Sequence, residues 1–491
     1  MSALEPDRAT RERWLRTLAD LVQEHLDGLE HAPAVGAQGK AAKKIIRETR
    51  VRVPEEPLPG GIERVAEVLR RAALASYTAP GPGYLAYIPG GGLFASALAD
   101  LVANALNRYT GIAAPAPAFV ALEAEVLAWL AREFGYGPAA AGLFTTGGSL
   151  ANWSAIVAAR HAAFGDSGDF RAALAYTSSQ AHHSVAKALR LAGVPPANLR
   201  AVAVDRRFRM EPLELRARLR DDKSRGLRPF LVVASAGTTN TGAIDPLGDI
   251  ADVCKAEGVW LHVDGAYGGA FVLCEEGKKR LAGIDRADSV VFDPHKGMFL
   301  PYGTGCLLVK DGAALRAAHA ESAAYLQDIA TDPDLPPSPA DLGPELSRDF
   351  RGLRVWLPLM LHGARAFREA LAEKLELARA FHDGLLRLRE ARLPLEVVDQ
   401  PQLSVVPFRL ARHEDEPLAA WNRRNADFLD GINAKGRVFL SSTLLPGPDG
   451  EVFTLRVCVL SFRTHAHRMA QALEDVAAAA GATPTGARTP R

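Results

Sequence analysis

The chain has 491 residues, of which 48% are hydrophobic, enough for a large buried core. Its 58 Lys and Arg balance 57 Asp and Glu, and a net charge of +1 gives no electrostatic reason to expect a nucleic-acid or anionic-membrane partner. Four widely spaced cysteines, and an N-terminus without a signal-like or membrane-spanning apolar run, predict a cytoplasmic protein with free thiols.

The first 80 residues predict a helical arm. Apolar side chains recur at helical spacing over residues 9–30 and again over residues 62–77. The stretch between them contains Pro and Gly, and we expect a long irregular connection. The apolar faces could pack on the chain's own body or on a second subunit, and the length of the connection favours an arm that interlocks with a partner chain.

Residues 81–365 predict an α/β domain. Short apolar runs with β-like composition alternate with helical stretches such as residues 149–163 and 247–257. The runs span residues 172–176, 201–204, 230–234, 259–263, 289–292 and 306–309. This alternation is typical of a mainly parallel sheet with helices on both faces.

The last part of the chain predicts a small α+β domain over residues 366–480. A long helical stretch is followed by strands near residues 403–408 and 454–459 and then by a final helix. Residues 481–491 are rich in Ala, Thr, Pro and Arg, and we expect this tail to be disordered.

Two predicted strand ends carry an amine and a carboxylate. Lys296 follows the run 289–292, where loss of hydration would favour the neutral amine, a nucleophile towards an aldehyde. Asp264 ends another run, and a protonated pyridine nitrogen would satisfy its charge and keep that ring an electron sink. The small Ala266 would let a flat ring lie close to the strand. Taken singly, the lysine could be a solvated loop residue and the aspartate a helix or turn cap.

Three other strand ends carry groups that suit a phosphate and an aromatic ring. Gly147, Gly148 and Ser149 open a helical stretch and offer backbone N–H groups and a hydroxyl to an anion, without the lysine of a nucleoside-triphosphate loop. His182 could stack on a ring and exchange protons, and the hydroxyl of Thr239 could bond a cofactor oxygen. Two adjacent histidines could also bind a metal, but neighbouring side chains point apart and no third ligand is near, so we expect no metal site.

The order of these groups along the chain is more specific than any one of them. A glycine cup is followed by a histidine, threonines, an aspartate and a lysine. This order resembles the group II pyridoxal-phosphate-dependent amino-acid decarboxylases, the family of the aromatic-L-amino-acid and glutamate decarboxylases. The resemblance covers most of the chain and is carried by residues 82–89, 116–118, 122–123, 293–296, 350–356 and 455–456.

The resemblance implies a fold and a set of residue roles. The fold would be the aspartate-aminotransferase type (fold type I), built as an intertwined homodimer with shared active sites and with N-terminal helices that clasp the partner. Lys296 would hold pyridoxal 5'-phosphate as an internal aldimine, Asp264 would pair with the pyridine nitrogen, and His182 would stack over the ring. The other implied cofactor contacts are Gly147, Gly148, Ser149 and His295 at the phosphate, and Thr239 and Ala266 at the ring.

Two departures from the family pattern bear on the reaction. Asp293 stands where family members often have Asn, which implies an acidic group near the phosphate. The family's mobile loop carries a tyrosine that protonates the substrate carbon after carbon dioxide leaves. Residues 332–347 contain no tyrosine here, and Tyr325 lies before them.

We therefore expect a decarboxylase that converts an L-amino acid to an amine and carbon dioxide, with Lys296, His182 and Asp264 as catalytic residues. Alternatives on the same fold are an oxidative aldehyde synthase, a transaminase and an aldol-type lyase. A cofactor-free binding scaffold is disfavoured, because such a relic would have little need for all three residues.

The substrate is expected to be an aromatic or other apolar amino acid. The residues expected to line the side-chain pocket are Tyr87, Ile88 and Pro89. This stretch is apolar and contains no arginine that would answer an acidic side chain.

Overall fold

A seven-stranded sheet forms the centre of the molecule, in a computed structural model that describes residues 4–166, 170–321 and 334–482. The strands, in the order β1-β7-β6-β5-β4-β2-β3, are β1 (Ala141–Thr145), β2 (Ala173–Ser178), β3 (Leu199–Val202), β4 (Arg228–Ser235), β5 (Trp260–Asp264), β6 (Ser289–Phe292) and β7 (Gly305–Val309). All neighbouring strands from β6 to β3 pair in parallel, whereas β7 is antiparallel to both β1 and β6. The predicted α/β fold with a mainly parallel sheet is confirmed.

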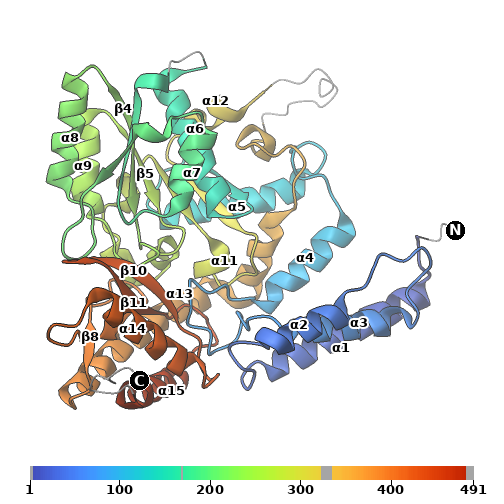
Figure 1. The fold of residues 1–491 in the computed structure, drawn as a ribbon. Helices are drawn as coiled ribbons and strands as arrows, with labels where there is room; N and C mark the ends of the chain where they lie inside the picture. Colours follow the sequence, from blue (N-terminus) through green and yellow to red (C-terminus); the bar gives the residue numbers. More distant parts are fainter. Residues whose placement is uncertain (1–3, 167–169, 322–333, 483–491) are drawn as a thin grey trace.

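Helices cover both faces of this sheet, and Figure 1 shows α6 and α7 on one side of β4 and β5 and α8 and α9 on the other. The first face carries α6 (Gly148–Phe164), α7 (His183–Leu191) and α12 (Gly312–His319). The second face carries α5 (Pro117–Glu133), α8 (Pro212–Ser224) and α9 (Leu247–Glu257), with α10 (Glu275–Arg280) and α11 (Pro294–Gly297) following β5 and β6. Strands β2, β6 and β7 are buried at every position, as expected for strands covered on both sides.

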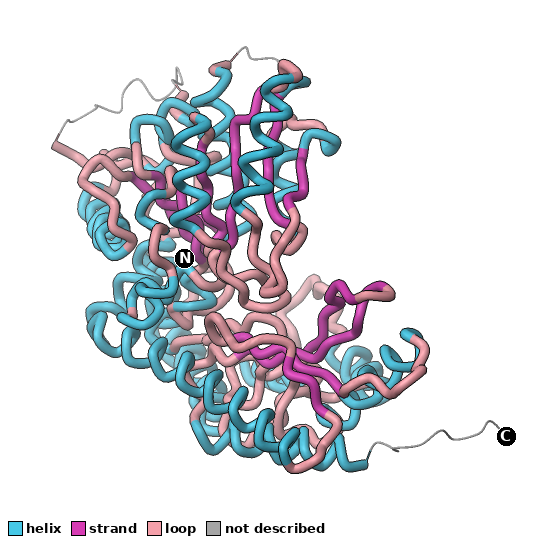
Figure 2. Tube along the Cα trace, turned by 90° about the vertical axis from the view of Figure 1, so that its left-hand side faces the viewer, coloured by secondary structure: helices cyan, strands magenta, loops and turns pink. Residues whose placement is uncertain are grey.

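The C-terminal part of the chain forms a second, antiparallel sheet with the strand order β10-β11-β9-β8, apart from the large sheet in Figure 2. Its elements are α13 (Arg351–Glu390), β8 (Leu395–Val397), β9 (Val405–Leu410), α14 (Leu418–Asn433), β10 (Ser441–Gly447), β11 (Gly450–Cys458) and α15 (Ala466–Ala482). Two of these strands were expected, near residues 403–408 and 454–459. The sequence did not indicate β8, which has only three residues, or β10, which contains Pro446 and Gly447.

The N-terminal helices extend away from the rest of the molecule (Figure 1). They are α1 (Arg8–Gly28), α2 (Gly39–Thr49) and α3 (Gly61–Ala73), and α4 (Phe94–Leu106) follows beside α13. The expectation of a long irregular connection between the first two predicted helices is wrong, because α2 occupies much of it. The basic sequence of α2 has only Ile45 and Ile46 as large apolar residues, too few to show a helical period.

Four other expectations concern the cysteines, membrane spans, the domain limits and the C-terminal tail. The four cysteines are free and buried. No helix in the described ranges is long and apolar enough to cross a membrane. The domain limits stay predictions, and Leu85, placed by them in the large domain, packs in the core of the C-terminal part. Most of the predicted disordered tail, residues 483–491, lies outside the described residues.

Candidate active site

A cavity of about 300 Å³ lies at the carboxyl ends of the parallel strands. Parallel strands bring these ends to one edge of a sheet, where ligands gather in folds of this kind. The structure brings all nine predicted cofactor residues into its wall: Gly147, Gly148, Ser149, His182, Thr239, Asp264, Ala266, His295 and Lys296. They come from five strand ends that are far apart in the sequence, so the fold assembles the site.

The glycine cup forms where β1 passes into α6. A Cβ atom added at Gly148 would lie 3.0 Å from both carboxylate oxygens of Asp293 and 3.2 Å from the Cβ of Ala266, so a larger side chain there would have to push these neighbours away. Helix α6 begins at Gly148, and the first backbone N–H groups of a helix have no partner within the helix. The cup therefore offers unpaired donors and the positive end of a helix dipole to a phosphate.

Asp264 ends β5 with its carboxylate buried. Its Oδ1 accepts the backbone N–H of Ala266 over 3.0 Å, and its Oδ2 accepts Nδ2 of Asn152 over 3.0 Å. An ionised carboxylate in such a place needs donors or a cation to compensate for lost hydration. These two donors hold the carboxylate of Asp264 and leave other lone pairs of its oxygens for a cationic partner such as a protonated ring nitrogen.

His182 caps the start of α7. Its Nδ1 lies 2.7 Å from the hydroxyl of Ser184 and accepts the backbone N–H of the same residue over 3.3 Å. Burial lowers the pKa of His182 below its usual value, although the nearby charge of Asp264 opposes this shift. The imidazole is therefore neutral near pH 7, and its proton lies on Nε2, because Nδ1 accepts.

Lys296 lies on α11, the short helix after β6. Its Nζ lies 2.8 Å from Oδ2 of Asp293, a buried carboxylate whose other oxygen has no hydrogen-bond partner among the described residues. His295 donates from Nδ1 to the carbonyl of Thr304 over 2.6 Å, and burial lowers its pKa below the usual value. Asp293 thus lies between the glycine cup and the ammonium of Lys296, and its expected place near a phosphate stays a prediction.

The residues expected to line the substrate pocket are not in the wall of this cavity. Tyr87 has a left-handed backbone (φ 52°), is about half exposed, and donates its backbone N–H to the hydroxyl of Ser441. Ile88 and Pro89 follow it. Their role stays a prediction.

Four residues around the site were not given a role from the sequence. Asn152 and Ser184 line the cavity, and His262 lies behind it at the middle of β5. Arg456 on β11 is buried, donates from Nη1 to Ser441, and has no partner for Nε or Nη2 among the described residues. A polar residue between apolar neighbours was the available signal, His262 between Leu261 and Val263 and Arg456 between Leu455 and Val457.

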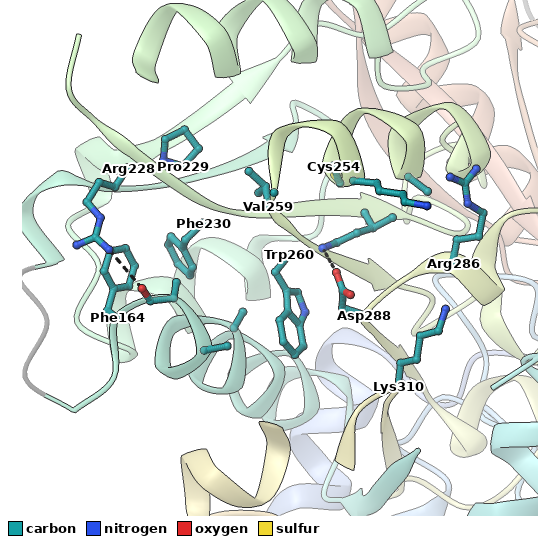
Figure 3. A pocket seen from close by; sticks show the side chains of 17 residues that line it. Phe164, Arg228, Pro229, Phe230, Cys254, Val259, Trp260, Arg286, Asp288 and Lys310 are labelled. Atoms are coloured by element: carbon teal, nitrogen blue, oxygen red, sulfur yellow. Dashed lines mark hydrogen bonds between the residues drawn. The ribbon is translucent and has the colours of Figure 1, made fainter. Parts of the chain in front are cut away.

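A second hollow of about 740 Å³, the far-edge hollow, lies at the opposite edge of the sheet, where β4 and β5 begin. Figure 3 shows Trp260 in its wall between Phe230 and Asp288, with Arg228 beyond at one side and Lys310 at the other. It is larger than the strand-end cavity but contains none of the predicted site residues. The residues predicted to carry the chemistry therefore gather in the smaller cavity.

The groups in the smaller cavity fit pyridoxal phosphate. A carboxylate suits the ring nitrogen, the donors at the start of α6 suit the phosphate, a lysine is available for the aldehyde, and Ala266 leaves room for a flat ring. In the described part of the chain, no cluster of His, Cys, Asp or Glu could hold a metal ion. Fold and site together define a pyridoxal-phosphate-dependent enzyme of fold type I.

Comparison with known proteins gives the family. The model for the pyridoxal-dependent decarboxylase conserved domain matches residues 62–411. An aromatic-L-amino-acid decarboxylase of Bacillus atrophaeus is 34% identical over 399 residues, 81% of each chain, and a phenylacetaldehyde synthase of Arabidopsis thaliana is 27% identical over 88% of each. The structure of Oryza sativa TDC with pyridoxal phosphate and tryptamine matches 98% of this chain and 99% of its own, with a TM-score of 0.89 and 25% identity. The chain belongs to the pyridoxal-dependent decarboxylase family, and the predicted family and cofactor are confirmed.

Proposed function

We propose that the protein decarboxylates an aromatic L-amino acid to the corresponding amine and carbon dioxide. The observation that carries the proposal is the meeting of Lys296, Asp264 and the glycine cup in one cavity at the strand ends. The names of the decarboxylase relatives favour an aromatic substrate. Tyr87, Ile88 and Pro89 lie outside the wall of the cavity, so their part in binding that substrate stays a prediction.

Each residue has a defined task in this proposal. Lys296 would hold the cofactor through its amine, which the amine of the substrate would replace. When bound, the cofactor supplies an electron sink for the bond that breaks at the α-carbon. Asp264 would keep the ring nitrogen protonated, and Asp293, whose Oδ2 lies 2.8 Å from Nζ of Lys296, would pair with the ammonium of Lys296 when it is not bonded to the cofactor.

A proton must reach the substrate carbon once carbon dioxide has left. His182 would serve this step as an imidazolium, which gives the proton on Nε2 to the carbon and returns to the neutral ring. The neutral ring, whose Nδ1 lies against Ser184, must first take up a proton from solvent. The loop in which relatives carry a tyrosine has none between residues 326 and 347, and of that stretch residues 326–333, together with Tyr325, lie outside the described residues. His182 is therefore the residue we propose as proton donor.

The missing tyrosine also favours a second candidate function, an aldehyde synthase. In that reaction the amino acid, dioxygen and water give an aldehyde, carbon dioxide, ammonia and hydrogen peroxide. The oxidant is dioxygen, which takes two electrons from the substrate carbon before that carbon is protonated. The similarity to a phenylacetaldehyde synthase supports this alternative.

One experiment separates the two functions. The purified protein is incubated with tyrosine, phenylalanine, tryptophan and glutamate in air and under nitrogen, and carbon dioxide, amine, aldehyde, ammonia and peroxide are measured. Stoichiometric amine in both atmospheres supports the decarboxylase. Aldehyde and peroxide that appear only in air support the synthase. No carbon dioxide from any aromatic amino acid contradicts both.

We also propose a homodimer with shared active sites and a cytoplasmic location. Helices α1 and α2 contain no buried residue, and large apolar side chains stay exposed along the arm, including Trp14, Leu15 and Ile46. An apolar surface of this kind is typical of a face that a partner covers. A second copy of the chain is the partner that the family resemblance implies.

A further inference from the structure

The side chains next to Asp264 form a row of hydrogen bonds that runs along one face of the sheet, from the edge where β5 begins to the edge where it ends. Asn152 donates to Asp264 over 3.0 Å, and Nε2 of His262 lies 2.8 Å from Oδ1 of Asn152. Nδ1 of His262 lies 2.8 Å from Oγ of Ser289, which accepts the indole N–H of Trp260 over 2.9 Å. The row thus runs from the wall of the far-edge hollow (Figure 3) to the active site, and its three middle members are buried.

The sequence of β5 accounts for this arrangement. Side chains two residues apart on a strand lie on the same face, so Trp260, His262 and Asp264 point to one side of the sheet. The register between β5 and β6 pairs His262 with Ser289. Helix α6 lies over β5 and places Asn152 between the histidine and the aspartate.

The direction of every hydrogen bond between Trp260 and Asp264 follows from these two end groups, because the indole can only donate and the carboxylate can only accept. An ionised carboxylate can only accept, so Asn152 must turn its NH₂ group to Asp264 and its oxygen to His262. Nε2 of His262 therefore carries a proton. Burial lowers the pKa of His262 well below its usual value, so the ring is neutral and Nδ1 is an acceptor. Ser289 donates to that nitrogen and accepts from Trp260, whose indole can only donate.

A branch of the same row reaches His182. The second N–H of Asn152 is donated to Oγ of Ser184 over 3.1 Å, and this oxygen lies 2.7 Å from Nδ1 of His182. Because Ser184 accepts from Asn152, its own hydroxyl proton is free to go to Nδ1. One asparagine amide thus serves both the carboxylate at the ring nitrogen and the imidazole above the ring.

We propose that His262 is a positioning residue whose Nε2–H tautomer locks the amide of Asn152 so that all donors point to Asp264 and, through Ser184, to His182. The inference rests on the proposed pairing of Asp264 with the cofactor's ring nitrogen. Hydrogen bonds that run in one direction in a buried network strengthen one another. Without the donor at His262, Oδ1 of Asn152 is left without its buried partner, so the amide is held less firmly and donates less strongly to the carboxylate, which weakens the hold of the site on a cationic ring.

Two variants of similar size test the role of His262. In His262→Gln the side-chain amide reaches the place of Nε2 and can still donate to Asn152. In His262→Asn the shorter amide mimics only Nδ1 and cannot reach. The probe is 4-deoxypyridoxine 5'-phosphate, which lacks the aldehyde and binds the full-length protein without a covalent bond, so that its ultraviolet absorbance reports protonation of the ring nitrogen.

The ring nitrogen should deprotonate at a similar pH in the wild type and in His262→Gln, and at least one pH unit lower, a tenfold change, in His262→Asn. The charged and titratable groups around Asp264 and His182, namely His183, Asp293 and Lys296, are unchanged in both variants. Trp260→Phe removes only the outermost donor and should shift the titration less than His262→Asn does. Equal shifts for those two variants would indicate a packing effect and overturn the inference.

Asp264→Asn separates this inference from the proposed function. If Asp264→Asn lowers the pH at which the ring nitrogen deprotonates and His262→Asn does not, the role proposed for His262 is wrong, whereas the pairing of Asp264 with the ring stands. If Asp264→Asn also titrates like the wild type, the pairing itself is wrong. Should His262→Asn not fold, the nitrogen-15 chemical shifts of His262 in the wild type decide, because an Nδ1–H tautomer or an imidazolium would contradict the assignment.

Discussion

Replacing Asp264 with asparagine removes the charge of the carboxylate and keeps its shape. Asp264 accepts one donor at each oxygen, the backbone N–H of Ala266 and Nδ2 of Asn152. An asparagine carbonyl can accept only one of them, and its NH₂ group would face the other. The donor left unpaired costs about 1–3 kcal/mol, and removing one partner of a buried ion pair costs about 3–5 kcal/mol.

These two costs predict two different measurements. The ion pair exists only with the cofactor bound, so its loss should lower kcat/KM by roughly 10²–10⁴-fold, at about 1.36 kcal/mol for each factor of ten. The unpaired donor should lower the free energy of unfolding of the cofactor-free protein by about 1–3 kcal/mol, measured by urea denaturation. Borohydride trapping should persist, because Lys296 is unchanged.

A matched control is available at the opposite edge of the sheet. Asp288 accepts the backbone N–H of Leu261 over 2.7 Å, and burial raises its pKa, but it lies in the wall of the far-edge hollow. Asp288→Asn should leave kcat/KM within about threefold of the wild type, since it alters no group of the site. An Asp264→Asn enzyme whose kcat/KM is as close to the wild type as that of the control would refute the reasoning.

Three further predictions concern the lysine, the cup and the arm. Lys296→Ala should abolish the borohydride-trapped cofactor on the peptide that contains residue 296, and persistent labelling of that peptide would contradict the assignment. Gly148→Val would push a side chain into the carboxylate of Asp293, so the Kd of the cofactor should rise by about tenfold or more, while Gly137→Val, where a Cβ meets nothing within 4 Å, should leave it unchanged. Deleting residues 1–75 should give insoluble or inactive protein, because the deletion removes the apolar helices that we propose contact the partner chain. A soluble, fully active monomer in size-exclusion chromatography would refute the dimer.

Most strands of the large sheet could be predicted, because burial on both faces leaves a direct trace in the sequence. None of the predicted runs covers β1, and β3, which is mostly not buried, begins two residues before its run. The run 289–292 matches β6 at both ends, and 306–309 differs from β7 by one residue. Polar residues directly after such runs stand at the edge of the sheet, which is why Asp264 and Lys296 could be placed at one site. Helix α9 was predicted with its observed bounds, since its apolar residues follow a clear period.

The contacts between side chains could not be predicted in the same way. In the sequence, His262 is one residue of an apolar run. Only the strand order, which places β6 beside β5, shows that Ser289 lies opposite it. Asn152 stood within the helix after the glycine cup, but the sequence does not say over which strand that helix lies. Strand order and helix placement are properties of the whole chain, and a buried hydrogen-bonded network depends on both.

Asp264 and Asp293 have different neighbours, and this difference determines which end of a cofactor each carboxylate can face. Asp264 is held by two neutral donors and retains a negative charge that suits a cationic ring. Asp293 already faces the ammonium of Lys296, and the unpaired N–H groups of α6 lie next to it at Gly148. A phosphate at the Asp264 end would meet an uncompensated negative charge, whereas at the α6 end it meets donors and a helix dipole. Helix α6 supplies both the cup at its first residue and, one turn later, the asparagine that holds Asp264, so in the proposed mode of binding one element would orient both ends of the cofactor before Lys296 forms any bond.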